Sequence, residues 1–272
     1  MYGHSVPHIT WLSWLHCRPP NTPLFTHSKS PMAPKKILLL GATGPSGIEV
    51  IKYAIAHDVE VLVYARNPDK IPEALRSDIH VTILPGGELS DTAALRDAVA
   101  QKPDAVVSLL GPPLREILSW MNPFSSATKQ PVFVNAYRVV VDAMTEFGVK
   151  RILAMGTISI PDEKDKLSIG RNILVWLVRL FMYNGWKNIV SVGKFFDGLE
   201  QEDRIQWTVF RLGAVLDGGF QNVTDGYVAD GKTALSVRRV ELAQWLVEQA
   251  VKEDPEWVGE KPVVSSAKKQ KI

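Results

Sequence analysis

The chain has 272 residues, with 31 Lys and Arg against 29 Asp and Glu, and a net charge of +2. This length suits one large α/β domain, and the mild, dispersed charge gives no reason to expect a nucleic-acid partner. The single cysteine, Cys17, excludes an internal disulfide framework and favours a reducing, cytoplasmic location. No apolar run is long enough to predict a membrane span.

Residues 1–33 differ in composition from the rest of the chain. They are rich in proline, hold four of the six histidines and contain no acidic residue. No basic start precedes an uninterrupted apolar core, which excludes a secretory signal peptide, and a single arginine is too few for a mitochondrial presequence. We predict a disordered extension, or sequence upstream of a natural start at Met32, and we assign its histidines to no metal site.

A glycine-rich turn follows the first predicted strand. An apolar run over 36–40 stops at a glycine, two more glycines follow at intervals of three residues, and a helical pattern begins at Ile48. Such glycines let a strand turn sharply into a helix and let the backbone approach a pyrophosphate, which the positive N-terminal end of the helix attracts. With a strand before it and a helix after it, the pattern predicts a dinucleotide site. The residues assigned to this site are Gly41, Thr43, Gly44, Pro45, Ser46 and Gly47.

Short strands and helices alternate along the rest of the chain. The predicted elements are strands 60–65, 79–84, 105–110, 151–155 and 207–211, and helices 92–101 (capped by Asp91), 134–147 (ended by Gly148), 172–182 and 187–202. The apolar helix 172–182 is too short for a membrane span and carries Arg179. We predict that it is largely buried, with a membrane-surface helix as the alternative.

This alternation predicts βαβ units with right-handed crossovers. The expected fold is therefore α/β, a doubly wound parallel sheet (Rossmann fold), in one domain over 34–264 with a small substrate-side elaboration. A basic, disordered tail is expected over 265–272.

From about Lys36 to Val264 the chain resembles the atypical short-chain dehydrogenases/reductases, the NAD(P)-binding group that includes flavin-reductase-like and NmrA-like proteins. The motifs that carry the resemblance are residues 41–47, 87–91, 106–111, 147–152, 206–212 and 236–243. The resemblance implies the fold and a nicotinamide cofactor more firmly than it implies a substrate, because function lies in the site and not in the fold.

The end of the second strand bears on cofactor preference. NAD-preferring domains place an acid there, about 20 residues past the glycines, to bind the ribose 2′-hydroxyl. This chain has Arg66 at that place and no acid until Asp69. The planar guanidinium can clamp a 2′-phosphate, with Lys70 assisting, so we expect NADP(H) to be favoured over NAD(H).

Two further places are assigned to the cofactor. By the resemblance, Glu88 and Leu89 stand where related proteins often have an Asp-Leu pair that holds the adenine, with a longer acidic side chain here. Leu110 and Gly111 end the fourth strand, where a glycine lets the backbone pass close to the adenosine ribose.

Catalytic residues are less clearly marked. Enzymes of the wider superfamily use Tyr-x-x-x-Lys, in which lysine lowers the tyrosine pKa so that the tyrosine can pass a proton to a carbonyl. Tyr183 and Lys187 have this spacing at the start of a predicted helix. A competing register gives the role to Lys194, as in the NmrA-like and isoflavone-reductase-like branch. Thr157 and Ser159, just past strand five, lie where a hydroxyl would meet the nicotinamide or a substrate oxygen, or would cap a turn.

Two long segments, 112–131 and 160–186, leave the carboxyl edge of the predicted sheet, where ligands bind in open α/β folds. Their apolar side chains either wall a substrate pocket or pack on the domain or on a second subunit. These side chains are Leu114, Ile117, Leu118, Trp120, Met121, Phe124, Trp176, Phe181 and Trp186. No metal-ligand spacing, Walker loop or nucleophile elbow is present, so no metal site is assigned.

Together these patterns predict an NADPH-dependent oxidoreductase that reduces a carbonyl, quinone or flavin-like group on a hydrophobic small molecule. The alternative is a non-catalytic NADP(H)-sensing module of the NmrA-like kind that docks a protein partner, and an epimerase or dehydratase that retains its cofactor is a third reading. A homodimer is left open.

Overall fold

The computed structural model describes residues 35–111, 132–199 and 205–267. The N-terminal extension and the apolar residues predicted between 112 and 131 lie outside these ranges. In chain order the elements are β1 (Lys36–Leu40), α1 (Pro45–Ile55), β2 (Glu60–Tyr64), η1 (Pro68–Lys70), α2 (Glu73–Arg76), β3 (Val81–Leu84), α3 (Thr92–Ala100), β4 (Ala105–Ser108), α5 (Val132–Phe147), β5 (Arg151–Thr157), α6 (Ile169–Phe181), α7 (Tyr183–Asp197), β6 (Gln206–Leu212), β7 (Ala214–Leu216), β8 (Val223–Gly226), β9 (Ser236–Arg238), α8 (Arg239–Val251) and β10 (Val263–Ser266).

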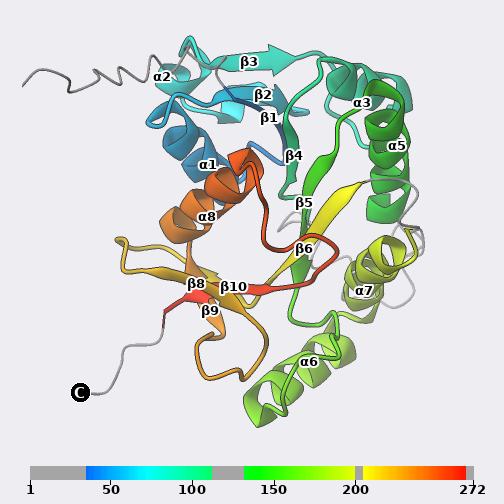
Figure 1. The fold of residues 1–272 in the computed structure, drawn as a ribbon, viewed down its shortest axis with the longest axis vertical. Helices are drawn as coiled ribbons and strands as arrows, with labels where there is room; N and C mark the ends of the chain where they lie inside the picture. The colour runs from blue at the N-terminus through cyan, green and yellow to red at the C-terminus, as the bar shows by residue number, and fades with distance from the viewer. Residues whose placement is uncertain (1–34, 112–131, 200–204, 268–272) are drawn as a thin grey trace, which may run out of the picture. The chain divides into compact units, whose positions relative to one another are not determined.

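The main sheet has the strand order β3-β2-β1-β4-β5-β6-β10-β8 (Figure 1). All neighbours pair in parallel except β8, which runs antiparallel to β10 at the edge. The chain moves outward from β1 to β3 and then returns to β4 on the other side of β1, so the strand order reverses between β1 and β4. This order confirms the doubly wound α/β fold, and the reversal is where such sheets bind ligands.

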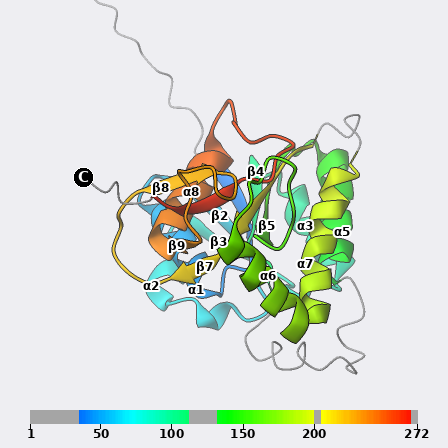
Figure 2. The ribbon, with the colours of Figure 1, turned by 90° about the horizontal axis from the view of Figure 1, so that it is seen from below.

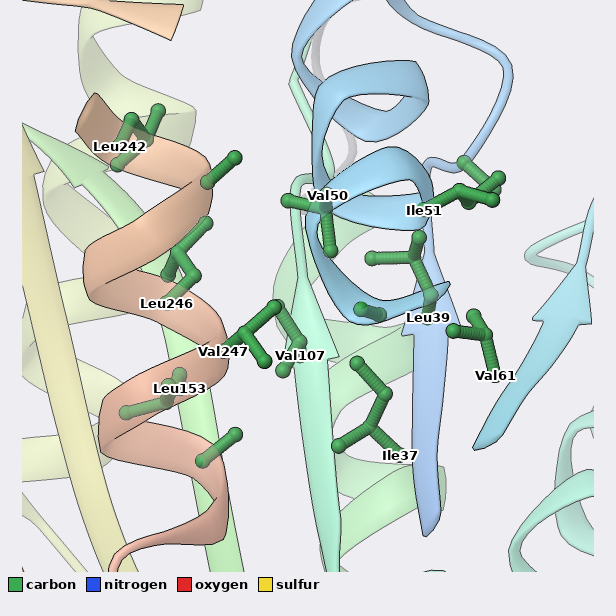
Figure 3. Close-up of a cluster of buried hydrophobic side chains, with 14 of the residues drawn as sticks. Ile37, Leu39, Val50, Ile51, Val61, Val107, Leu153, Leu242, Leu246 and Val247 are labelled. Atoms are coloured by element: carbon green, nitrogen blue, oxygen red, sulfur yellow. The ribbon is translucent and has the colours of Figure 1, made fainter. Parts of the chain in front are cut away.

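Each central strand is buried on both faces, which explains why it appears in the sequence as a continuous apolar run. In β1, Ile37 and Leu39 face the layer formed by α1 and α8, as Figure 3 shows. Leu38 and Leu40 face the opposite layer, formed by α3, α5 and α7. The predicted cap of α3 is confirmed, because the Asp91 carboxylate accepts a hydrogen bond from the Ala94 amide at 3.0 Å.

The prediction that helix 172–182 is largely buried is wrong. The helix, α6, has no buried residue, and it lies outside the two helix layers, next to α7 (Figures 1 and 2). Its inner side is held through Arg171, whose Nε donates to the Ile158 carbonyl at 2.9 Å. An apolar composition predicts that a helix packs against an apolar neighbour, but most of the apolar surface of α6 has no such neighbour within the described ranges. No helix in those ranges is long and apolar enough to cross a membrane.

The C-terminal part contains strands that the sequence did not indicate. β7 and β9 form a separate two-stranded parallel sheet, and β10 lies between β6 and β8 in the main sheet. These strands have three or four residues, too few to show a clear alternation of apolar and polar positions. β10 includes Ser265 and Ser266, and the Ser265 hydroxyl accepts from the Ala234 amide at 2.9 Å, so the sheet extends into the segment predicted as the tail.

Candidate cofactor and active site

The three glycines after β1 differ in whether the surrounding chain leaves room for a side chain. Gly41 has φ +86, and a Cβ there would lie 2.8 Å from the Leu109 carbonyl oxygen, so the turn brings the ends of β1 and β4 together. A Cβ on Gly47 would lie 2.6 Å from the carbonyl oxygens of Gly41 and Ala42. A Cβ on Gly44 would meet only the Gly41 oxygen at 3.6 Å, an ordinary contact. The chain itself therefore does not require glycine at 44, whereas a ligand approaching the turn would.

The N-terminus of α1 is open to an anion. Its N-cap is Gly44, which provides no side-chain hydrogen bond, and Pro45 occupies the first turn without an acidic residue beside it. The first N–H groups of a helix have no partner inside the helix, and the helix dipole adds a positive end. Glycine at the cap and free N–H groups fit a pyrophosphate, with Thr43 and Ser46 on the same turn.

Arg66 follows β2 as expected, but the loop after β3 brings an acid to it. Gly87 has φ +123 and packs so closely that a Cβ would lie 2.2 Å from the Arg66 nitrogen. The Tyr64 hydroxyl donates to the Glu88 carbonyl at 2.8 Å, and burial raises the Tyr64 pKa, which keeps the hydroxyl protonated. The Glu88 carboxylate thereby lies 3.9 Å from an Arg66 guanidinium nitrogen, and both side chains are exposed.

Two other charged residues, Asp69 and Lys70, follow β2. Asp69 is paired with Arg76, which also binds Glu73, so Asp69 already has a partner other than Arg66. Lys70 ends η1 with an exposed side chain. Arg66 and Lys70 thus remain as exposed cations after β2, with Glu88 facing the first.

The end of β4 lies beside the glycine turn that follows β1. The Leu109 amide donates to the Leu40 carbonyl at 2.8 Å, which extends the pairing of β4 with β1. Leu110 and Gly111 are partly buried beyond it, and a Cβ on Gly111 would lie 2.6 Å from the Met155 methyl group of β5. Because this contact is with the far end of a flexible side chain, it requires glycine less strictly than the contacts at Gly41 and Gly47.

The two hydroxyls after β5 have different surroundings. Thr157 is the last residue of β5 and is partly exposed, and its Oγ1 accepts from the Ser159 amide at 3.2 Å. This turn-capping bond uses the hydroxyl as an acceptor and leaves its proton for another group. Ser159 is buried. The capping role and the ligand role of Thr157 are therefore compatible.

Tyr183 and Lys187 lie on one face of α7, because the helix begins at Tyr183 and residues four apart are neighbours. Both side chains are exposed. Lys194 lies on the same face, about 10 Å further along the axis. It follows Gly193, where a Cβ would lie 2.6 Å from Ile160, just past the end of β5. Asp197, the acid of the Lys-x-x-acid pattern, binds Lys261 at 2.6 and 2.8 Å.

A buried ion pair that sequence reasoning missed holds the segment after β5. Arg211 of β6 is fully buried and donates to both carboxylate oxygens of Asp165, at 2.6 and 2.8 Å, and to the Ile160 carbonyl at 3.0 Å. Burial opposes ionisation of Asp165, but the bonds from Arg211 and from the Val228 amide outweigh it and hold the Asp165 pKa below its usual value. An arginine in an apolar strand indicates a buried acid nearby, although the sequence does not say which one.

Two cavities lie in the described part of the chain, and neither is lined by a residue assigned to the cofactor. One, of about 340 Å³, adjoins the start of α6; its lining residues are Ser168, Val228, Ala229, Thr233, Ala234, Leu235 and Val263. The other, of about 410 Å³, lies between α5 and α7; its lining residues are Arg138, Val141, Asp142, Thr145, Phe195 and Leu199. Neither includes the predicted pocket residues Trp176 and Phe181, which are exposed, or Trp186, which lies under Arg179.

The sheet order and the glycine turn at its reversal define a dinucleotide-binding domain. A family model described as NAD(P)H-binding matches residues 41–253, and the chain belongs to this family. Within the described ranges no group of three or more His, Cys, Asp or Glu residues could hold a metal ion.

Solved structures have the same fold. A short-chain dehydrogenase/reductase from Veillonella parvula, in complex with NADP, is 13% identical with a TM-score of 0.65, over 85% of this chain and 94% of that one. An oxidoreductase from Lactococcus lactis is 17% identical with a TM-score of 0.58, over 86% and 91%. An anaerobilin reductase from Escherichia coli O157:H7 is 16% identical with a TM-score of 0.58, over 88% and 100%. The family match confirms the NAD(P)-binding part of the resemblance, and these solved structures share the fold that the resemblance implies.

Proposed function

We propose that the protein is an NADPH-dependent oxidoreductase that reduces a carbonyl, quinone or flavin-like group on a hydrophobic small molecule. The observation that carries the proposal is the conjunction of two features. The uncapped N-terminus of α1, with glycine at 44, receives the pyrophosphate, and Thr157 at the end of β5 and Tyr183 and Lys187 on α7, the helix that packs on β5, supply hydroxyl and ammonium groups.

The chain's own residues bind the cofactor and handle the proton. Gly44 and the free N–H groups of α1 bind the pyrophosphate, and Arg66 binds the 2′-phosphate. A bound nicotinamide supplies the hydride. Tyr183 donates a proton to the substrate oxygen, and the Lys187 ammonium, one turn along α7, stabilises the tyrosinate that remains. Thr157 orients the substrate oxygen through its free hydroxyl proton.

Arg66 favours NADPH over NADH, and the neighbouring Glu88 carboxylate weakens this preference. A 2′-phosphate must compete with the Glu88 carboxylate for the same guanidinium. Both side chains are exposed, so the competing pair is weak, on the order of 0–1 kcal/mol. A charge-assisted contact to the phosphate is worth more, about 1.5–3 kcal/mol, and therefore prevails.

Cofactor titration tests this preference. We expect wild type to bind NADPH more tightly than NADH, and R66A to lose at least about tenfold of NADPH affinity with little change for NADH. R96A is the matched control, because Arg96 is another exposed arginine paired with a glutamate, Glu146, and this pair joins α3 to α5. Equal affinities for the two cofactors in wild type, unchanged in R66A, would contradict the assignment.

Turnover tests the catalytic roles, with NADPH oxidation followed over a panel of quinones, flavins and aldehydes. We expect Y183F to lower kcat by about 10²-fold or more while NADPH binding stays intact, and K187M to lower it too. K194M is the control on the same helix face and should be silent. If K194M is the damaging variant, the Tyr183–Lys187 assignment is wrong. Tight NADPH binding without oxidation by any of the panel would favour the non-catalytic binding module.

A further inference from the structure

The outer face of α6 is an apolar stripe, defined here as Ile169, Ile173, Trp176, Leu177 and Leu180. Their spacing places them on one side of the helix. Their exposed fractions are 74%, 54%, 60%, 38% and 57%. The opposite side, with Arg171, Val175 and Val178, is partly buried toward the protein. A contiguous exposed apolar surface of this kind marks an interaction site.

The charged residues of the segment that carries the stripe have one sign. No Asp or Glu occurs between Lys166 and Phe196, although the whole chain is nearly balanced at 31 basic and 29 acidic residues. The basic residues of this segment are Lys166, Arg171, Arg179, Lys187 and Lys194. None of the five forms an ion pair with an acid in the described part of the chain. The acid just before the segment, Asp165, is already bound to Arg211.

We propose that the α6 stripe docks on the surface of an anionic lipid bilayer. An interfacial helix needs an apolar face with aromatic residues, which the stripe has in exposed Trp176, with exposed Phe181 at the C-terminal end of the helix. It also needs basic side chains beside that face to meet anionic headgroups. Arg179 and Lys166 flank the stripe, and no acid of the same segment opposes the attraction.

A second copy of the chain fits this surface less well. Two α6 stripes related by a two-fold axis would bring two acid-free, basic segments together, so the apolar gain would be opposed by uncompensated like charge. An anionic bilayer satisfies both the apolar face and the charge. The docking is independent of the oxidoreductase proposal, although α6 follows the carboxyl edge of the sheet and would bring that edge close to lipid-soluble molecules.

Vesicle co-sedimentation of the full chain tests the proposal. The vesicles are phosphatidylcholine alone and phosphatidylcholine with phosphatidylserine, each at low and high salt. We expect binding to the vesicles that contain phosphatidylserine, weakened by salt, and little binding to phosphatidylcholine alone. Each of the two substitutions in I173S/L180S should lower the vesicle affinity by about tenfold or more. I79S is the matched control, because Ile79 is an isoleucine with 92% exposure outside α6, and it should bind as wild type does.

The charge contribution is tested separately. K166Q should lower the affinity about fivefold, and K150Q, at an exposed lysine outside the segment, should not. Absence of wild-type binding to vesicles with phosphatidylserine overturns the proposal, as does unchanged binding of I173S/L180S. Sedimentation velocity gives the competing outcome: a wild-type dimer that I173S/L180S abolishes, with no vesicle binding, assigns the stripe to a second copy.

Discussion

The substitution D165N removes one charge from the buried pair with Arg211 while keeping the shape of the side chain. Arg211 has no exposed surface and cannot turn to water, so its charge would stay buried without a counter-ion. Breaking such a pair costs about 3–5 kcal/mol, because the remaining charge is uncompensated. That is a large part of the roughly 5–15 kcal/mol that stabilises a typical domain. We expect the free energy of unfolding to fall by about this amount.

The same pair sets a pH dependence. The pKa of Asp165 lies below its value of 3.8 in the unfolded chain, because burial, which opposes ionisation, is outweighed by the bonds from Arg211. A carboxyl whose pKa is lower in the folded state stabilises the fold above the unfolded pKa, and this stability is lost as the pH falls through the folded pKa. Wild type should therefore lose this contribution below about pH 4, and D165N should not.

Urea unfolding at neutral pH and at steps toward acid measures both effects. The matched control is D217N, because Asp217 pairs with Arg239 but is 90% exposed, and such surface pairs contribute about 0–1 kcal/mol. The double variant D165L/R211M should recover part of the loss, since it leaves no buried charge. If D165N is no less stable than D217N, or if the double variant is less stable than D165N, the reasoning is refuted.

Three further predictions concern the cofactor site and the chain's start. G47A should destabilise the fold by about 1–3 kcal/mol and weaken NADPH binding, because its Cβ would lie 2.6 Å from two carbonyl oxygens. The control is G198A, where the nearest atom to a Cβ would be 3.4 Å away. Equal melting temperatures for G47A and G198A would contradict this prediction. E88Q should raise NADPH affinity severalfold by freeing Arg66, as measured by fluorescence titration, and a lower affinity would show that the carboxylate helps to bind the cofactor. A chain begun at Met32 should melt as the full chain does, and a large loss of stability would show that the extension belongs to the fold.

The parts of the fold that the sequence predicted are those with local causes. The turn through Gly41 and Gly47 could be predicted because a strand, a close approach and a helix start all require glycine within seven residues. The Asp91 cap could be predicted because its partner is three residues away. The burial of α6 could not be predicted, because composition does not say which other part of the chain would cover it.

The candidate site was predicted in part for the same reason. Arg66 could be placed from its distance along the chain after the glycines, but its contact with Glu88 depends on how the loop after β3 packs on β2. Arg211 and Asp165 are 46 residues apart, and no periodicity connects them. The start of α7 at Tyr183 depends on where α6 ends, which propensity leaves uncertain by several residues.

The position of β10 has a consequence for how the chain folds during synthesis. β10 is an interior strand, paired with β6 on one side and β8 on the other, although it comes last in the described chain. The Arg211 amide and its Nε donate to the carbonyls of Pro262 and Lys261, just before β10. The strands β1 to β5 pair only with one another except at the β6 side of β5, so these strands can pair as they leave the ribosome, whereas the layer on their α1 side is completed only when α8 has emerged. The half that holds Arg211 can close only after residue 266 has emerged, so a ribosome paused before that point would present an unpaired edge at β6.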